Sequence, residues 1–196
     1  MIPGPTEIPW RIARSMMRPS MAHYDPEFNI GVLDLTLQEL RRVFQIKNEV
    51  VALPGSGRVA VESAITSIIE PGDRVLSVVC GVFVRWMKEI VETIGGEAVE
   101  FPVEWGQPID LARVEETLSK GDFKALTVVH NESSTGTMYP LDEIGQMAKG
   151  SGVLYVVDGV SSLGGVNIET DNGNIDSLAT ASQKCLCAPA GWRSCP

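Results

Sequence analysis

Four short apolar runs, separated by amphipathic stretches, constrain the fold of this chain more than any other feature of its sequence. They cover residues 50–53, 75–79, 125–129 and 153–157. Each run is rich in β-branched residues and lacks alternation of apolar and polar residues, which is typical of strands buried on both faces. A fifth short strand is expected over residues 177–181.

The stretches between these runs have the period of amphipathic helices. In residues 83–94 the side chains of Phe83, Met87 and Val91 fall on one helical face, and Lys88 and Glu92 lie off it. Similar helices are expected within residues 27–45, 59–69, 111–118 and 140–148. Strands that alternate with helices predict an α/β fold, a mostly parallel sheet wound by helices. Ligands of such sheets bind beyond the carboxyl ends of the strands.

The composition allows a substantial core and excludes several classes of protein. The chain has 196 residues, of which 44% are hydrophobic, so it can bury a core of its own. No apolar run approaches the roughly 20 residues of a membrane span, and the N-terminus lacks a signal-peptide pattern. The net charge is −9 and no basic stripe interrupts it. We therefore expect neither nucleic acid nor a membrane as a partner.

The four cysteines, Cys80, Cys185, Cys187 and Cys195, indicate a reducing compartment. They are too few and too clustered for a disulfide framework. The last three could be considered as a metal site, but their spacing is not that of a zinc knuckle and no histidine lies near them in the sequence. We expect thiols, no bound metal and a cytoplasmic location.

The first apolar run leads into a turn that contains Gly55, Ser56, Gly57 and Arg58, ahead of an expected helix. Small residues let backbone N–H groups face a ligand, and a helix N-terminus carries partial positive charge, so this turn suits a phosphate. The same glycines match the dinucleotide fingerprint of a Rossmann fold, but no acidic residue follows the second strand to hold a ribose. A plain tight turn is the third interpretation.

Two other strands also end in polar residues. Residues 130–136 (HNESSTG) carry short hydrogen-bonding side chains, which suit a polar ligand or an ordinary loop, and His130 is expected to be structural. Asp158 directly follows the run 153–157. Because a carboxylate at the end of a buried strand is costly unless it is paired, Asp158 either caps the local turn or faces a metal or a protonated ring nitrogen.

Lys184 follows the last expected strand, in the sequence Ser182-Gln183-Lys184. It is either a surface lysine on a loop or a buried amine suited to Schiff-base chemistry. A phosphate cradle, a carboxylate for a ring nitrogen and such a lysine are together the parts of a pyridoxal-phosphate site.

With these residues the sequence resembles the class V aminotransferases of fold type I, in the alanine–glyoxylate, serine–glyoxylate and ureidoglycine–glyoxylate branch. The resemblance runs over nearly the whole chain. It rests on residues 3–6 (PGPT), 23–28 (HYDPEF), 55–58 (GSGR), 130–136 (HNESSTG), 157–165 (VDGVSSLGG) and 182–184 (SQK). It implies an N-terminal arm over residues 1–25 and a large domain that binds pyridoxal 5'-phosphate over residues 26–196.

The resemblance also implies roles for single residues. Lys184 corresponds to the lysine that holds the cofactor as an imine and then acts as general base and acid, and Asp158 to the partner of the pyridine nitrogen. The cofactor phosphate is expected to contact Ser56, Gly57, Arg58 and Gln183.

Three further positions are implied around the ring and two near the substrate. Ser133 corresponds to a hydroxyl at the side of the ring, and Val160 to a residue packed against one face. Phe83 lies where the family places an aromatic residue, often tryptophan, over the other face. Phe83 is also expected to be the first core residue of its helix, and this structural role is compatible with the role at the ring. Gly4 and Pro5 correspond to an arm that approaches the substrate.

The activity implied is transfer of an amino group from alanine, serine or ureidoglycine to glyoxylate, by a homodimer. The family continues for about as long again and adds a small C-terminal domain, whereas this chain ends twelve residues after Lys184. Its tail, residues 190–196, also departs from the apolar strand expected there, which suggests a frameshifted, truncated or alternatively ended product. An inactive fragment that at most binds the cofactor or a partner subunit is therefore the alternative, and a nucleotide-binding Rossmann module a third hypothesis.

Overall fold

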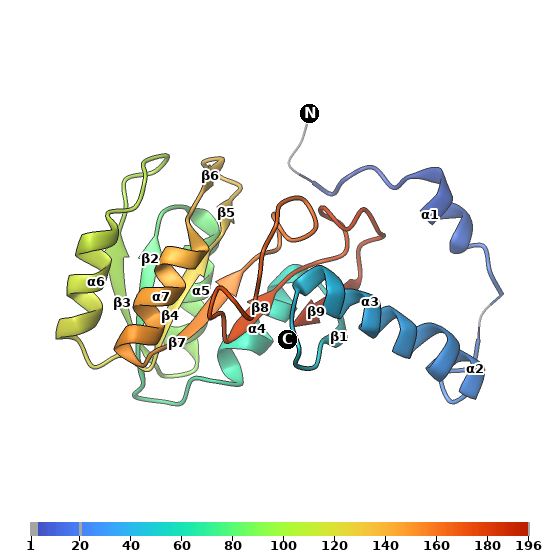
Figure 1. Cartoon of the computed structure of the whole chain (residues 1–196), viewed down its shortest axis with the longest axis horizontal. Coiled ribbons are helices and arrows are strands. Elements are labelled where there is room, and N and C mark those ends of the chain that lie inside the picture. Colours follow the sequence, from blue (N-terminus) through green and yellow to red (C-terminus); the bar gives the residue numbers. More distant parts are fainter. Residues whose placement is uncertain (1–3, 20, 196) are drawn as a thin grey trace.

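A five-stranded parallel sheet forms the centre of the molecule, in the strand order β3-β2-β4-β7-β8 (Figure 1). The computed structural model describes residues 4–19 and 21–195, with the backbone alone for residues 192–195. The five strands are β2 (Arg74–Val79), β3 (Glu97–Pro102), β4 (Ala125–Val129), β7 (Leu154–Asp158) and β8 (Ser177–Ala179).

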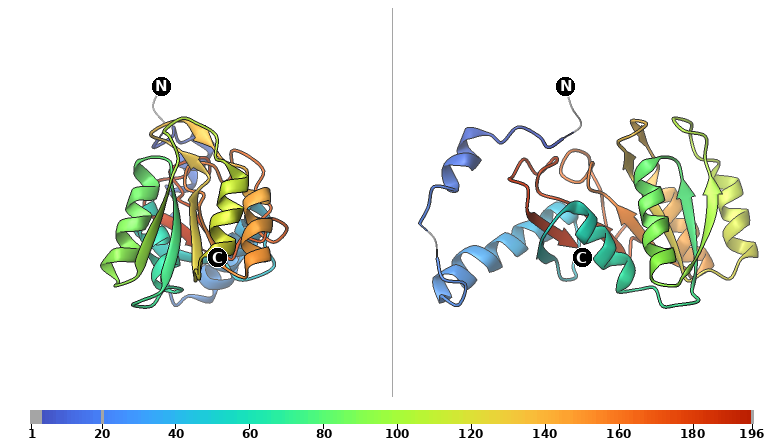
Figure 2. Two further views of the ribbon diagram at one scale, coloured as in Figure 1. Left: turned by 90° about the vertical axis from the view of Figure 1, so that its left-hand side faces the viewer. Right: turned by 180° about the vertical axis from the view of Figure 1, so that it is seen from behind.

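Helices cover both faces of this sheet. On one face lie α4 (Gly57–Thr66) and α5 (Val82–Thr93), and on the other lie α6 (Leu111–Lys120) and α7 (Leu141–Ser151) (Figure 2, left). The predicted α/β fold, a mostly parallel sheet wound by helices, is confirmed. None of the helices in the described part of the chain combines the length and the apolar character that a bilayer crossing requires.

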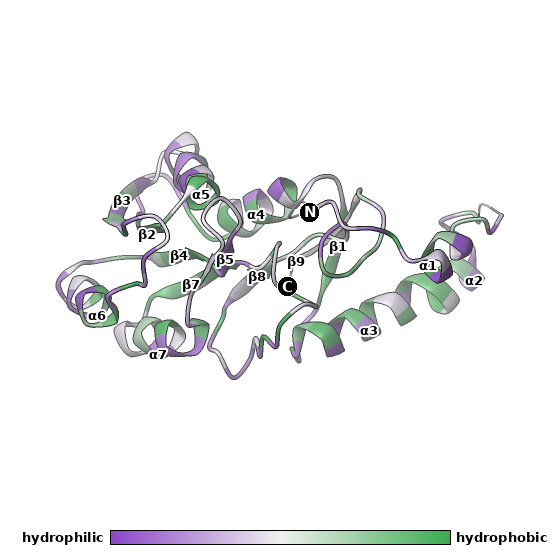
Figure 3. Ribbon diagram, turned by 90° about the horizontal axis from the view of Figure 1, so that it is seen from above, coloured by the Kyte–Doolittle hydropathy of each residue, from purple (hydrophilic) through white to green (hydrophobic). Residues whose placement is uncertain are grey.

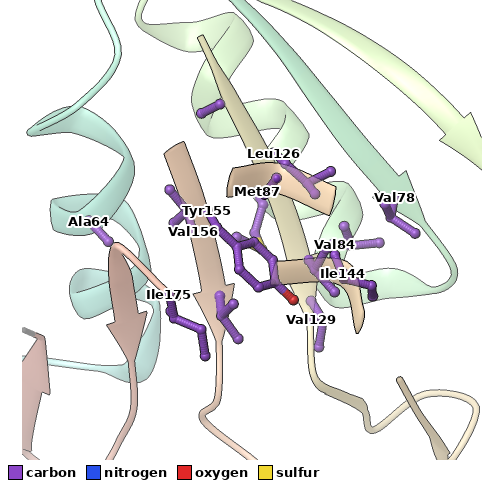
Figure 4. Close-up of a cluster of buried hydrophobic side chains, with 14 of the residues drawn as sticks. Ala64, Val78, Val84, Met87, Leu126, Val129, Ile144, Tyr155, Val156 and Ile175 are labelled. Atoms are coloured by element: carbon purple, nitrogen blue, oxygen red, sulfur yellow. The ribbon is translucent and has the colours of Figure 1, made fainter. Parts of the chain in front are cut away.

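The core lies between the sheet and the helices on its two faces. Strands β2, β4 and β7 are buried almost throughout, because helices cover them from both sides. Figure 4 shows Leu126 of β4 and Tyr155 of β7 beside Met87 of α5 and Ile144 of α7. Hydropathy follows this arrangement, since the strands are mostly hydrophobic while α5 and α6 carry both hydrophobic and hydrophilic residues (Figure 3).

The first apolar run does form a strand, but the expectation that it is covered on both faces is wrong. Strand β1 (Val51–Pro54) lies outside the central sheet and pairs antiparallel with β9 (Trp192–Cys195). Val51 is 49% exposed, because a two-stranded sheet offers little surface to cover it. The tail therefore does supply a strand, although its side chains and residue 196 lie outside the described part.

The N-terminal region extends away from the sheet (Figure 1). It contains α1 (Trp10–Ser15), then α2 (Pro26–Phe28), a π-helical stretch over Asn29–Asp34 and α3 (Leu35–Phe44). Helix α1 lies within the predicted arm, of which residues 1–3 and 20 are outside the described residues. A short hairpin of β5 (Asn131–Glu132) and β6 (Thr137–Met138) follows β4.

Candidate active site

The carboxyl ends of the strands meet at one edge of the sheet, where they surround a cavity of about 300 Å³. Strand β7 ends in Asp158, β8 leads into the loop of Lys184, and β1 leads into the N-terminus of α4. Eight of the predicted site residues line the cavity: Ser56, Gly57, Arg58, Phe83, Asp158, Val160, Gln183 and Lys184. Val61, Trp86 and Ile90 complete the lining.

The N-terminus of α4 forms one end of this cavity. Ser56 precedes the helix in an extended conformation, and its hydroxyl does not cap the helix. A Cβ on Gly57 would lie 3.1 Å from Val160 and 3.2 Å from Ala181, so glycine lets the helix start close to the cavity wall. With a partial positive charge from the helix, this end suits an anion.

Gln183 carries a polar atom that fits a ligand at this site. Its Oε1 atom is buried and has no hydrogen-bond partner within the described residues. Buried polar atoms without partners are rare in folded proteins, because leaving one unpaired costs free energy. Oε1 is an acceptor and therefore calls for a donor from a ligand, whereas the amide nitrogen of Gln183, the Ser56 hydroxyl and the Arg58 guanidinium are donors of the kind that a phosphate group accepts.

Aromatic side chains from α5 form a wall of the cavity, and one of them, Trp86, was not predicted from the sequence. The ring of Trp86 packs edge-on against Phe83, with centroids 4.8 Å apart, and the Arg58 guanidinium lies 3.8 Å from the Trp86 ring. The position of Trp86 three residues after Phe83, one helical turn on, was the available signal. Trp86 therefore orients Arg58 by a cation–π contact.

Asp158 is buried at the end of β7 and lines the cavity. The pKa of Asp158 is raised to about 6, chiefly by burial; the hydrogen bond from the Val160 N–H and the charge of Lys184 act to lower it, and the charge of Glu132 acts to raise it. The Val160 N–H donates to Asp158 Oδ1 at 2.8 Å. Asp158 thus both caps the local turn and presents a carboxyl group to the cavity.

The N-terminal arm lies over Lys184. A Cβ on Gly4 would lie 2.7 Å from Cδ and 2.9 Å from Nζ of Lys184, so only glycine allows this approach. Thr6 fixes the arm, since its N–H donates to the Gln183 carbonyl at 2.9 Å and its hydroxyl to the Lys184 carbonyl at 2.7 Å. Pro5 lies between them. Thr6 was part of the PGPT motif, but its role depends on a contact across the whole chain.

Ser133 and His130 lie beside the cavity rather than in its lining. The Ser133 hydroxyl is 2.7 Å from that of Ser161. His130 Nδ1 lies 2.9 Å from the Ser162 hydroxyl, and burial lowers the pKa of His130 to about 4, which leaves its ring neutral near pH 7. This agrees with a structural His130.

Residues 12–192 match the sequence model of the family "Aminotransferase class-V". The match takes in the cavity and most of the elements around it, and the chain belongs to the class V aminotransferases. The Rossmann interpretation of the glycine turn receives no support from this family.

Curated proteins similar to this chain are named as aminotransferases. The chain is 43% identical to an uncharacterized aminotransferase of Methanocaldococcus jannaschii, over 97% of this chain and 50% of that protein. It is 35% identical to the (S)-ureidoglycine–glyoxylate transaminase of Bacillus subtilis, over 97% of this chain and 46% of that enzyme. The chain thus spans about half the length of the curated relatives it matches.

A solved structure of an aminotransferase has the same fold as this chain. The alanine–glyoxylate aminotransferase of Nostoc sp. superimposes with a TM-score of 0.95 at 32% identity, covering 100% of this chain and 52% of that one. The fold is the large domain of fold type I enzymes, whose cofactor is pyridoxal phosphate. The donors at α4, the close approach that Gly57 allows there and the carboxyl group of Asp158 fit this cofactor.

Proposed function

We propose that this chain binds pyridoxal phosphate in the cavity at the strand ends and serves amino transfer from a small amino acid to glyoxylate. The observation that carries the proposal is the meeting of Lys184, Asp158 and the N-terminus of α4 around one cavity. The names of the relatives support alanine or ureidoglycine as donor. Serine is included because the motif resemblance extends to serine–glyoxylate enzymes.

The residues at the α4 end hold the cofactor's phosphate. Backbone N–H groups of the first turn, the Ser56 hydroxyl, Arg58 and the Gln183 amide donate hydrogen bonds to it. The cation–π contact with Trp86 limits the rotamers of Arg58. Less side-chain entropy is then lost on binding.

When bound, the cofactor supplies a ring that accepts electrons and an aldehyde carbon that takes up the amino group. Asp158 holds a proton at the ring nitrogen. Its burial strengthens an ion pair with that nitrogen, because few water molecules compete. A cationic partner there would favour the ionised form of Asp158, whose pKa is raised to about 6 mainly by burial.

Lys184 would hold the cofactor through its amine, and the same amine would move the proton of the substrate's α-carbon as general base and acid. Gly4 lies against its side chain, and Gly4 with Pro5 is proposed to approach the substrate. Val160 and Phe83 both line the cavity and, by the resemblance to the family, would pack against the two faces of the ring.

Ser133 is proposed to contact the edge of the ring. This role comes from the resemblance; Ser133 lies beside the cavity, with its hydroxyl 2.7 Å from that of Ser161. A homodimer in the cytoplasm is proposed for the whole protein, by analogy with the family.

A second candidate for the 196-residue chain by itself is binding of the cofactor or of a partner subunit without turnover. This chain covers 50% and 46% of two curated relatives. An assay with alanine, serine or ureidoglycine plus glyoxylate separates the candidates. Sustained formation of glycine supports the transferase, whereas cofactor binding without glycine supports the second candidate.

Replacing Lys184 tests the cofactor site itself. Purified protein with pyridoxal phosphate should show the visible absorption of lysine-bound cofactor, and Lys184→Ala should abolish it because the amine that forms the bond is gone. Lys47→Ala, which removes an exposed lysine, serves as the matched control and should keep the band. An identical spectrum for wild type and Lys184→Ala would exclude the assignment.

A further inference from the structure

Glu132 is a fully buried carboxylate that the proposed reaction does not use. It ends β5, and its oxygens accept three hydrogen bonds. Oε2 accepts from the Phe83 N–H at 3.0 Å, and Oε1 accepts from the Ser134 N–H at 3.0 Å and the Ser134 hydroxyl at 2.6 Å. These bonds, with the positive end of α5, offset the cost of burying the group.

Helix α5 has no N-terminal cap of its own. The residue before it is Gly81, which has no side chain to accept from the first N–H groups. The Ser134 hydroxyl accepts from the Val82 N–H at 3.1 Å, and Glu132 accepts from the next N–H, that of Phe83. The hairpin after β4 thus caps a helix that lies far from it in the sequence, since Phe83 precedes Glu132 by 49 residues.

Position 81 has room only for a glycine beside the side chain of Glu132. A Cβ at this position would overlap the side chain of Glu132 and approach the Ser134 hydroxyl. The carboxylate of Glu132 can therefore occupy this place only because residue 81 has no side chain. This close approach links the hairpin to the start of α5 more rigidly than a single hydrogen bond would.

The capped turn carries the aromatic wall of the cavity. Phe83 lies in the first turn of α5 and lines the cavity, and Trp86 follows one turn later and holds Arg58. We propose that Glu132 is a positioning residue that fixes the start of α5 and thereby aims Phe83 at the cofactor. This inference rests on the proposed function, since it assigns a role at the same site.

Glu132→Gln tests the inference in the full 196-residue chain. A glutamine has one oxygen instead of two, so the N–H of either Phe83 or Ser134 loses its acceptor. We expect faster hydrogen exchange at one of these two amides, a changed visible circular dichroism of the bound cofactor, and a dissociation constant for pyridoxal phosphate about tenfold higher. Ser134→Ala removes the acceptor for Val82 and should act in the same direction.

Glu115→Gln is the matched control. Glu115 is an exposed glutamate on α6, and its replacement should change none of the three measurements. If Glu132→Gln only lowered the global stability, the visible circular dichroism of the protein saturated with cofactor would stay unchanged.

A double mutant shows whether Glu132 acts through Phe83. In a Phe83→Leu background, Glu132→Gln should change the dissociation constant by less than about twofold, because the aimed ring is already absent. An equal effect in both backgrounds would overturn the inference, as would unchanged exchange at both amides.

These outcomes are separable from failure of the proposed function. If wild-type protein does not bind pyridoxal phosphate, the proposed function fails and the role of Glu132 at the cofactor fails with it. Binding by wild type together with unchanged spectra and affinity in Glu132→Gln and Ser134→Ala would overturn the inference alone.

Discussion

Two neighbouring residues at the end of the central strands have pKa values shifted in opposite directions by the same cause. Burial raises the pKa of Asp158 to about 6 and lowers that of His130 to about 4, because it disfavours the charged form of each. The His130 N–H donates to the Asp158 carbonyl at 2.9 Å, so the two residues are held together through the backbone.

His130 should make stability depend on pH. The pKa of about 4 in the folded protein lies below the ordinary histidine value of 6.5, so the unfolded chain binds the proton first as pH falls. The contribution of His130 to the free energy of unfolding is fully present above pH 6.5. It is lost as pH falls toward 4, and the loss amounts to at most about 3 kcal/mol. His130→Gln should flatten this fall in urea unfolding measured across that range.

The other histidine provides the control for this experiment. His23 is exposed, and His23→Gln should leave the pH dependence as in wild type. Asp158 opposes His130 in the same range, since its raised pKa favours the folded state at low pH, and this contribution is common to all three proteins. Parallel curves for wild type and His130→Gln would contradict the prediction.

The sequence could place Asp158 and Lys184 near the carboxyl ends of strands, and both line the cavity. Asp158 stood out because a charged group at the end of a buried run needs a partner, whereas the role expected of Lys184 rested on the resemblance to the family. Glu132 and Trp86 could not be predicted, since a glutamate in a polar loop and a tryptophan on a helix have ordinary interpretations. Their roles depend on which elements the fold brings together.

At the scale of elements, the buried parallel strands were predictable, including β8 at one edge of the sheet, whereas the exposed edge strand β3 was not. Strands β2, β4 and β7 match continuous apolar runs, whereas β3 carries Glu97 and Glu100. Strand β3 is covered less completely, so its sequence lacks the continuous apolar run. Strand β1 was predicted, but its pairing with β9 depends on residues more than a hundred positions away.

Two glycines of α7 should respond oppositely to the same substitution. A Cβ on Gly145 would overlap the carbonyl oxygen of Gly173, whereas a Cβ on Gly150 would meet no atom within 4 Å. Gly145→Ala should destabilise the fold by about 2 kcal/mol or more, because backbone must move. Gly150→Ala should stabilise it by roughly 0.5–1 kcal/mol, since alanine is the better helix former.

Thermal or urea unfolding of the two variants measures this difference. Because both substitutions lie in one helix and add the same methyl group, helix propensity alone predicts equal effects. Equal stabilisation by both would show that Gly145 does not pack against the residue 173 loop as described.

At the scale of the whole molecule, Thr6 joins the N-terminal arm to the lysine loop. Thr6→Ala removes the hydroxyl that donates to the Lys184 carbonyl. We expect faster tryptic cleavage in α1, at Arg11 or Arg14, and about fivefold weaker retention of pyridoxal phosphate, the scale of one lost hydrogen bond.

Thr36→Ala is the control for the arm. Its hydroxyl donates to the Val32 carbonyl within the same helical segment, so its loss should leave cleavage in α1 and cofactor retention unchanged. Unaltered cleavage in Thr6→Ala would show that the hydroxyl does not hold the arm.

The bond between Thr6 and Lys184 spans 178 positions of the chain, which sets an order of events during synthesis. At about 5–20 residues per second, the ribosome adds Lys184 roughly ten to forty seconds after Thr6. The nascent arm therefore waits without its docking partner while α4 and the phosphate end are already made. If Lys184 holds the cofactor as proposed, its covalent capture has to wait until at least the first 184 residues have been made.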